Sequence, residues 1–113
     1  MKKYIIILSV AFLASCSAKI IMPSQSDAER GRSKFPGLTV DDLNQGEKLF
    51  NTKCTQCHGP KRPKSWTEEQ WRKIVPAMAE KATISGKKEI TQADQDLVLK
   101  YVITMGPDQH GKR

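Results

Sequence analysis

Cys54-Thr55-Gln56-Cys57-His58 is a C-x-x-C-H string, and it constrains the fold and function of this 113-residue chain more than any other stretch. Such a string predicts covalent attachment of a c-type haem. The thiols of Cys54 and Cys57 can form thioether bonds to the haem vinyl groups, and the imidazole of His58 then lies beneath the porphyrin as the proximal iron ligand. The string therefore predicts one haem c per chain and one of the two axial ligands of its iron.

A C-x-x-C pair can also belong to a zinc site or to a redox-active dithiol. A zinc site needs a second pair of ligands, but after His58 the chain has no further cysteine and only one further histidine, His110. A thioredoxin-like dithiol is expected near a βαβ unit, whereas the flanking sequence has helical periodicity. The residues therefore favour haem over either alternative.

Residues 1–15 have the pattern of an export signal. Two lysines precede a mostly apolar run over residues 4–13, which is too short to span a bilayer. The run ends in Leu13-Ala14-Ser15-Cys16, which resembles the lipobox of bacterial lipoproteins; an ordinary signal peptide with an unrelated cysteine is the alternative. We therefore expect a lipid on Cys16 and a location in the bacterial cell envelope, facing the periplasm, with the choice of inner or outer membrane left open. Two cysteines on haem and one on lipid would account for all three thiols.

The charge of the chain bears on its partners. Lys and Arg number 19 against 12 Asp and Glu, for a formal net charge of +7, and removal of residues 1–15 would leave +5. An exported, lipid-anchored chain rarely meets nucleic acid, so the expected partners are acidic redox proteins and an anionic membrane surface.

The chain divides into four segments. After the signal peptide, Pro and Gly residues without sustained periodicity predict a flexible tether over residues 16–38. The alternative is that Ile20, Ile21 and Met22 pack onto the domain. Residues 39–107 form the one expected domain, and residues 108–113 a polar tail.

Three helices and no strand are expected in this domain. The first spans about 41–53 with a cap at Thr39 or Asp41, the second runs from a capping box at Thr67 to about Ala82, and the third runs from Thr91 to Met105. Their apolar faces comprise Leu43, Gly46, Leu49 and Phe50; Trp71, Ile74, Val75, Met78 and Ala82; and Leu97, Val98, Tyr101, Val102 and Met105. Pro76 predicts a kink or break in the second helix. So small an all-α domain has little core of its own, and a haem would complete it.

The stretch from Gly46 to Lys53, followed by the C-x-x-C-H string, resembles the first helix and haem motif of class I cytochromes c. In that family a Gly-x-x-x-Phe pair on the first helix crosses an aromatic residue on the last, and Gly46, Phe50 and Tyr101 match these positions. Residues 71–78 resemble the small monohaem domains of bacterial lipoprotein cytochromes c. The resemblance covers about residues 41–105. It implies a small class I cytochrome c fold, with three main helices around one covalently bound haem.

The resemblance also implies a methionine as the second iron ligand, and Met78 is the only methionine between the haem motif and the last helix. Packing in the core is the alternative for Met78. Met105 is expected in the core and His110 in the solvated polar tail, and each is an alternative to Met78 as the iron ligand.

Other pocket residues follow from the same resemblance. The carbonyl of Pro63, or else of Pro60, is expected to accept the second ring proton of His58, although both prolines can simply stiffen a loop. Trp66 and Trp71 are expected to line the haem pocket or the core. Lys53 and the basic residues at 61, 62 and 64 flank the motif and can steer an acidic partner to it, or form an ordinary solvated surface.

These residues predict a one-electron carrier rather than an enzyme: a membrane-tethered monohaem c-type cytochrome with His58 and Met78 on the iron. It would carry electrons between exported or membrane redox proteins, as a monomer or as a subunit of a respiratory complex. Two alternatives stay open. One is a haem enzyme or gas sensor with an open sixth site, and the other is an accessory electron-relay subunit of a larger oxidoreductase.

Overall fold

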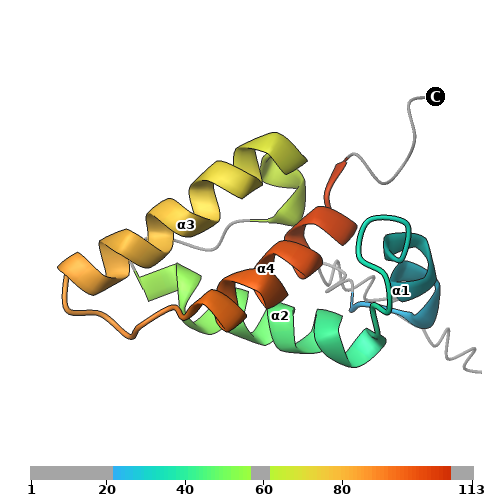
Figure 1. Ribbon diagram of the computed structural model, residues 1–113, viewed down its shortest axis with the longest axis horizontal. Coiled ribbons are helices and arrows are strands. Elements are labelled where there is room, and N and C mark those ends of the chain that lie inside the picture. Colours follow the sequence, from blue (N-terminus) through green and yellow to red (C-terminus); the bar gives the residue numbers. More distant parts are fainter. Residues whose placement is uncertain (1–21, 57–61, 108–113) are drawn as a thin grey trace, which may run out of the picture.

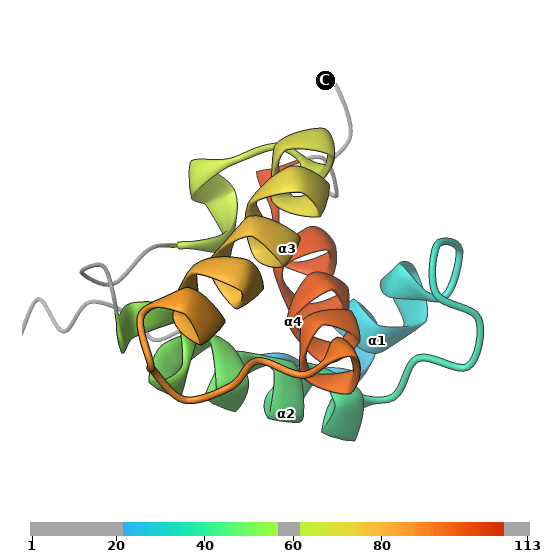
Figure 2. The same ribbon diagram turned by 60° about the vertical axis from the view of Figure 1, so that its left-hand side comes forward.

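The computed structural model describes residues 22–56 and 62–107, and in these ranges the chain is entirely helical (Figure 1). It contains α1 (Gln25–Gly31), α2 (Val40–Thr52), α3 (Glu68–Ile84) and α4 (Gln92–Thr104), with 3₁₀ turns η1 (Cys54–Gln56) and η2 (Pro63–Ser65). Helix α4 lies between α3 and α2 (Figure 2), and α1 lies near the C-terminal end of α4 (Figure 1). The all-α prediction is thus confirmed for the described part of the chain.

The starts of the helices follow from local sequence. Each α-helix begins with a capping box, in which the N-cap hydroxyl accepts the N3 amide and the N3 side chain accepts the N-cap amide. The N-cap and N3 pairs are Ser24 and Asp27, Thr39 and Asp42, Thr67 and Gln70, and Thr91 and Asp94. The three predicted helices are therefore confirmed to within two residues at their ends.

Helix α3 continues unbroken through Pro76, so the break considered at this proline is wrong. Buried residues of α3 lie on both sides of the proline, Val75 before it and Ala79 after it, and both pack inward. Pro76 itself is exposed. Packing along the inner face therefore keeps the helix continuous, although the proline removes one backbone hydrogen bond.

The closest packing in the fold is the crossing of α2 and α4 at Gly46. A Cβ atom on Gly46 would overlap the backbone carbonyl of Leu97 and would lie 2.7 Å from the Cβ of Tyr101. Only glycine permits this approach, because the two backbones occupy the space that any side chain would need. One turn later Phe50 is buried, and its ring centroid lies 5.8 Å from that of Tyr101. The structure thus brings Gly46, Phe50 and Tyr101 together.

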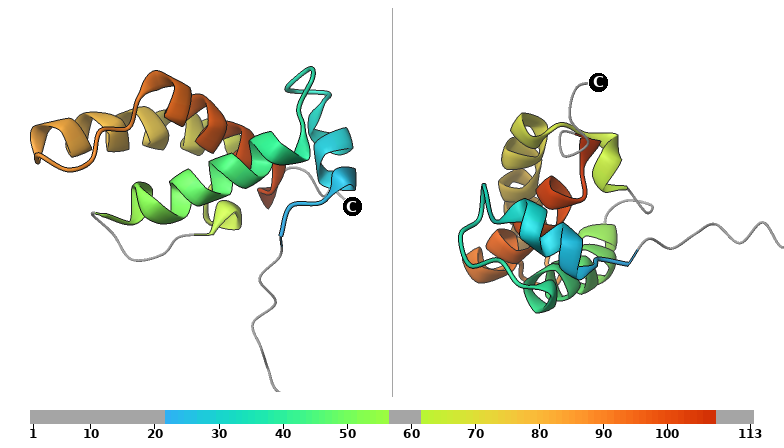
Figure 3. Two further views of the ribbon diagram at one scale, coloured as in Figure 1. Left: turned by 90° about the horizontal axis from the view of Figure 1, so that it is seen from below. Right: turned by 90° about the vertical axis from the view of Figure 1, so that its right-hand side faces the viewer.

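The N-terminal part of the described chain differs from the expected flexible tether. Residues 25–31 form α1, and Ala28 and Leu38 are buried with Leu43 in a small second core. The Arg30 guanidinium donates to the carbonyl of Thr104 at 3.2 Å, which ties α1 to the end of α4 (Figure 3). Composition alone suggested a linker, but the buried side chains here outweigh the local Pro and Gly. Residues 16–21 of the expected tether, with Cys16, lie outside the described residues.

The Gly46 crossing gives a stability prediction. Gly46→Ala should lower the free energy of unfolding by about 2 kcal/mol or more, because the new methyl group overlaps backbone rather than a movable side chain. Urea unfolding followed by circular dichroism measures this change. Asn44→Ala is the control: Asn44 is an exposed residue of α2 where alanine should be neutral or slightly stabilising. Equal midpoints for the two variants would contradict the crossing.

Candidate functional site

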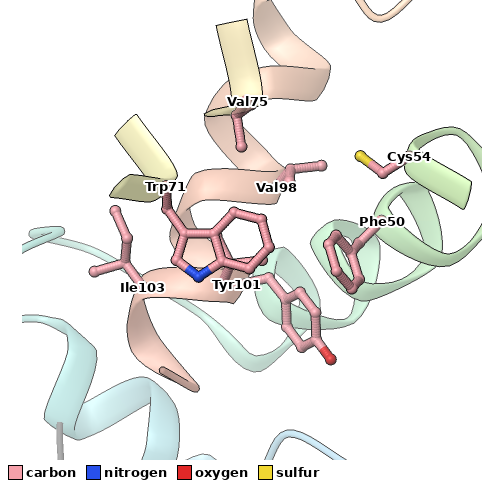
Figure 4. Packing of buried hydrophobic residues seen from close by; sticks show 8 residues of the cluster. Phe50, Cys54, Trp71, Val75, Val98, Tyr101 and Ile103 are labelled. Carbon is pink, nitrogen blue, oxygen red and sulfur yellow. The ribbon is translucent and has the colours of Figure 1, made fainter. Parts of the chain in front are cut away.

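The candidate site is built around Cys54, the first residue of the turn that follows α2. Gly46, Phe50 and Cys54 are spaced four residues apart, so they continue one face of α2 toward the core. The Cys54 side chain is buried, with only 7 % of the residue exposed, and its sulfur points toward the part of the core that holds Val98 and Val75 (Figure 4). Cys57 and His58, the rest of the predicted attachment site, lie outside the described residues.

Burial changes the chemistry of this thiol. Loss of solvation raises the pKa of Cys54 to about 11, so it is protonated at neutral pH. Reactive cysteines of redox C-x-x-C motifs have lowered pKa values, because the thiolate is the nucleophile. A buried neutral sulfur suits a thioether instead, since a thioether carries no charge that burial would disfavour. The environment of Cys54 therefore fits permanent attachment better than disulfide exchange.

Aromatic side chains belong to the buried cluster that contains Cys54. Trp71 is fully buried, and its ring meets Phe50 edge-on at a centroid distance of 5.7 Å and Trp66 at 4.8 Å. Trp71 and Phe50 belong to the same cluster as Cys54, with Val75, Val98, Tyr101, Val102 and Ile103. Trp71 therefore lies in the core beside the candidate attachment residue, while Trp66 is partly buried at its edge. Core packing of Trp71 is thus observed, and its place in a haem pocket stays a prediction.

The carbonyl of Pro63 accepts a hydrogen bond from the indole Nε1 of Trp71 at 2.9 Å. Sequence reasoning assigned this carbonyl to His58 and did not foresee the indole donor. A carbonyl oxygen can accept two hydrogen bonds, so the pairing with His58 is compatible with the one observed. The Trp71 bond fixes η2 against α3.

Two thioether side chains adjoin this cluster. Met78 on α3 and Met105 at the end of α4 are both partly buried, and both pack against the cluster that contains Cys54. Among residues 22–56 and 62–107 no group of three His, Cys, Asp or Glu is placed to hold a metal ion. His110, the third candidate ligand, lies outside the described residues.

The surroundings of Cys54 fit a haem. Its thiol faces an apolar interior, and Ile74, Leu49 and Leu99 pack against the cluster with part of their surface still exposed. Half-buried apolar side chains of this kind can cover the faces of a large apolar cofactor. The described residues therefore offer an attachment sulfur, an apolar wall and a thioether donor in one region.

Lys53 and Gln56, which lie on either side of Cys54, have partners within the chain that the sequence did not predict. The Lys53 ammonium lies 2.6 Å from the Asp94 carboxylate and 2.8 Å from the carbonyl of Glu89, so it is paired within the chain. Lys53 is therefore engaged in an internal ion pair, and its role in steering a partner stays a prediction. The Gln56 amide bonds the backbone of Lys88. These partners are more than thirty residues away, and no local pattern identifies them. Arg62 and Lys64 are exposed, which agrees equally with steering of a partner and with an ordinary solvated surface.

The Lys53–Asp94 pair predicts a pH dependence of stability. The hydrogen bond and charge of Lys53 lower the pKa of Asp94 below its ordinary 3.8. A carboxyl group whose pKa is lowered by folding stabilises the folded state above its unfolded pKa, and the contribution disappears as the pH falls through the folded value. Lys53→Met should therefore cost about 1 kcal/mol at about pH 7 and much less near about pH 2.

Urea unfolding at the two pH values measures this difference. Lys73→Met is the control, because Lys73 and its partner Glu69 are both exposed and should contribute little at either pH. A loss from Lys53→Met that is the same at both pH values would show that Asp94 is not the source.

No family model, no curated protein and no solved structure matches this chain. None of the helices in residues 22–56 and 62–107 has the length and apolar character needed to cross a bilayer. The features of the site that bear on its chemistry are the buried Cys54 thiol, the aromatic rings of the same cluster, and the thioethers of Met78 and Met105.

Proposed function

We propose that this protein is a one-electron carrier, a monohaem c-type cytochrome of class I type that binds one haem c through Cys54 and Cys57. One observation carries the proposal: the first cysteine of a C-x-x-C-H string lies buried in an apolar core shared by α2, α3 and α4. A cofactor attached there would lie against the core rather than on the surface. The raised pKa of Cys54 and the all-helical described chain favour this function over that of a dithiol oxidoreductase.

In this proposal the protein residues hold the cofactor and control its surroundings. Haem supplies reversible one-electron chemistry at its iron. Cys54 and Cys57 would hold it covalently, and His58 and Met78 would bind its iron. Phe50, Trp71 and their neighbours in the core exclude water from one side of the site. The chain then needs no catalytic residue, because an electron carrier transforms no substrate.

The remaining parts of the proposal concern location and partners. The lipobox resemblance at Cys16 supports export and attachment to a bacterial membrane, with the domain facing the periplasm. Exposed Arg62 and Lys64 beside the motif support recognition of acidic redox proteins. A basic net charge of +7 for the whole chain agrees with such partners.

Covalent attachment is the first test. The full chain, produced in a bacterial host with c-type haem maturation proteins, should gain the mass of one haem and keep haem fluorescence or stain on a denaturing gel. Cys54→Ser combined with Cys57→Ser should abolish the covalent signal, because both thioether bonds are lost. Cys16→Ser is the control: it should keep the haem and shift the protein from the membrane to the soluble fraction. A wild-type chain without covalent haem would overturn the proposed function.

The distal ligand is tested separately with two matched variants, Met78→Leu and Met105→Leu. Leucine keeps the volume and apolar character of methionine but cannot bind iron. Met78→Leu should remove the weak long-wavelength band that methionine ligation gives to ferric haem, and should lower the reduction potential, because thioether sulfur favours ferrous iron. Met105→Leu should change neither. The opposite pattern would transfer the ligand role to Met105, and an unchanged band in both would exclude methionine ligation by either residue.

A further inference from the structure

We infer that Gln56 and Lys53 are positioning residues of the cofactor site: together they clamp the α3–α4 connection, residues 85–91, onto the attachment turn. This inference rests on the proposed function and extends it. The two residues bracket Cys54 in sequence, one just before it and one inside the C-x-x-C pair. Their side chains bind backbone groups of Lys88 and Glu89, in the connection that follows the helix carrying Met78.

Gln56 makes the more directional of the two connections. Its side-chain carbonyl accepts the Lys88 amide at 3.0 Å, and its Nε2 donates to the Lys88 carbonyl at 3.3 Å. The same Nε2 donates to the carbonyl of Lys53 at 2.8 Å. One amide side chain thus pairs with both backbone groups of a residue 32 positions away and also with its own turn. This fixes the distance and the orientation between the two segments.

Lys53 holds the next part of the same connection. Its ammonium donates to the carbonyl of Glu89 and to the carboxylate of Asp94. That Asp94 oxygen also accepts the Thr91 amide in the capping box of α4. The clamp therefore ends on the first turn of α4, a rigid element, rather than on a free loop.

The connection is equally well joined to α3. Gly86 has a positive φ of 65°, and the Lys87 amide donates to the carbonyl of Ala82 at 2.9 Å, which closes the helix in a Schellman motif. Ile90 is then buried against Ala79 and Ala82 of α3. A displacement of residues 85–91 therefore moves the C-terminal half of α3 with it.

The position of Met78 depends on this route. Met78 lies one turn before Ala82, and α2 and α3 each pack mainly on α4. The connection passes beside the C-terminal end of α2 (Figures 1 and 2). Gln56 and Lys53 therefore form a direct link between the turn that carries Cys54 and the helix half that carries Met78. Loosening the link should let α3 move away from the cofactor more easily.

The test uses the haem-loaded full chain in the ferric state and imidazole as an added ligand. Imidazole can bind the iron only when the protein ligand on the α3 side gives way. Gln56→Ala should bind imidazole about tenfold more tightly than wild type, and Lys53→Met should change affinity in the same direction. Gln56→Glu keeps an acceptor for the Lys88 amide but has no donor for its carbonyl, so it should have an intermediate affinity.

Gln45→Ala is the matched control, because within the described part of the chain the Gln45 amide bonds only the Asp41 carboxylate, one turn away on α2. It should leave imidazole affinity unchanged. Hydrogen exchange gives a second readout that does not depend on the iron: the Lys88 amide should exchange faster in Gln56→Ala than in Gln45→Ala.

The outcomes separate the two levels of inference. Absence of covalent haem from the wild-type chain would overturn the proposed function, and this inference with it. A haem-loaded Gln56→Ala variant with unchanged imidazole affinity would overturn the positioning role alone, as would unchanged exchange of the Lys88 amide. A larger affinity together with faster exchange would establish it.

Discussion

The close crossing of α2 and α4 at Gly46 is the constraint on which the other contacts depend. Since no side chain separates the helices, the backbone of α4 at Leu97 lies directly against α2. Four and eight residues after Gly46, Phe50 of α2 and Cys54 of η1 continue the same face, and both are buried in the core. Phe50 contacts both Tyr101 on α4 and Trp71 on α3. The crossing therefore also influences where α3 packs. The inward direction of the Cys54 thiol follows from its place on this face.

An apolar setting for a cysteine can have two very different meanings. In a core without a cofactor, Cys54 would be an inert small hydrophobic residue. Next to a second cysteine and a histidine in a C-x-x-C-H string, the same burial gives a neutral thioether a suitable place. The core of this domain is small, and aromatic rings from α2, α3 and α4 meet in it. The rings of Phe50 and Trp66 are nearly perpendicular to the ring of Trp71. Such a core gives a flat apolar cofactor a firm surface on one side.

Local rules account for what could be predicted from the sequence. The capping boxes at Thr39, Thr67 and Thr91 involve residues three apart, and the role of Gly46 follows from its place in a helix next to an aromatic partner. The α1 helix was missed although Ser24 and Asp27 form the same kind of box, because the prolines and glycines around it favoured a linker. Ala28 and Leu38 pack on the domain, and this packing stabilises α1.

Contacts between distant segments explain the rest. Gln56 occupies a position of the C-x-x-C-H motif that haem attachment leaves free, so the motif says nothing about its partner. Its pairing with Lys88 depends on how the α3–α4 connection folds back. The indole of Trp71 likewise finds the carbonyl of Pro63 only after η2 has turned toward α3. Such hydrogen bonds need the tertiary structure before they can be recognised.

The packing of α1 on the domain has a consequence for the reach of the protein from a membrane. If the lipid is on Cys16, only five residues, 17–21, separate the anchor from Met22, the first described residue, and the six residue steps of a fully extended chain span roughly 20 Å. The end of the domain that carries α1 would then stay close to the bilayer, with Arg30 fastened to α4 beside it. Such a carrier could exchange electrons only with proteins whose redox centres lie near the same membrane surface, and it would meet them by lateral diffusion.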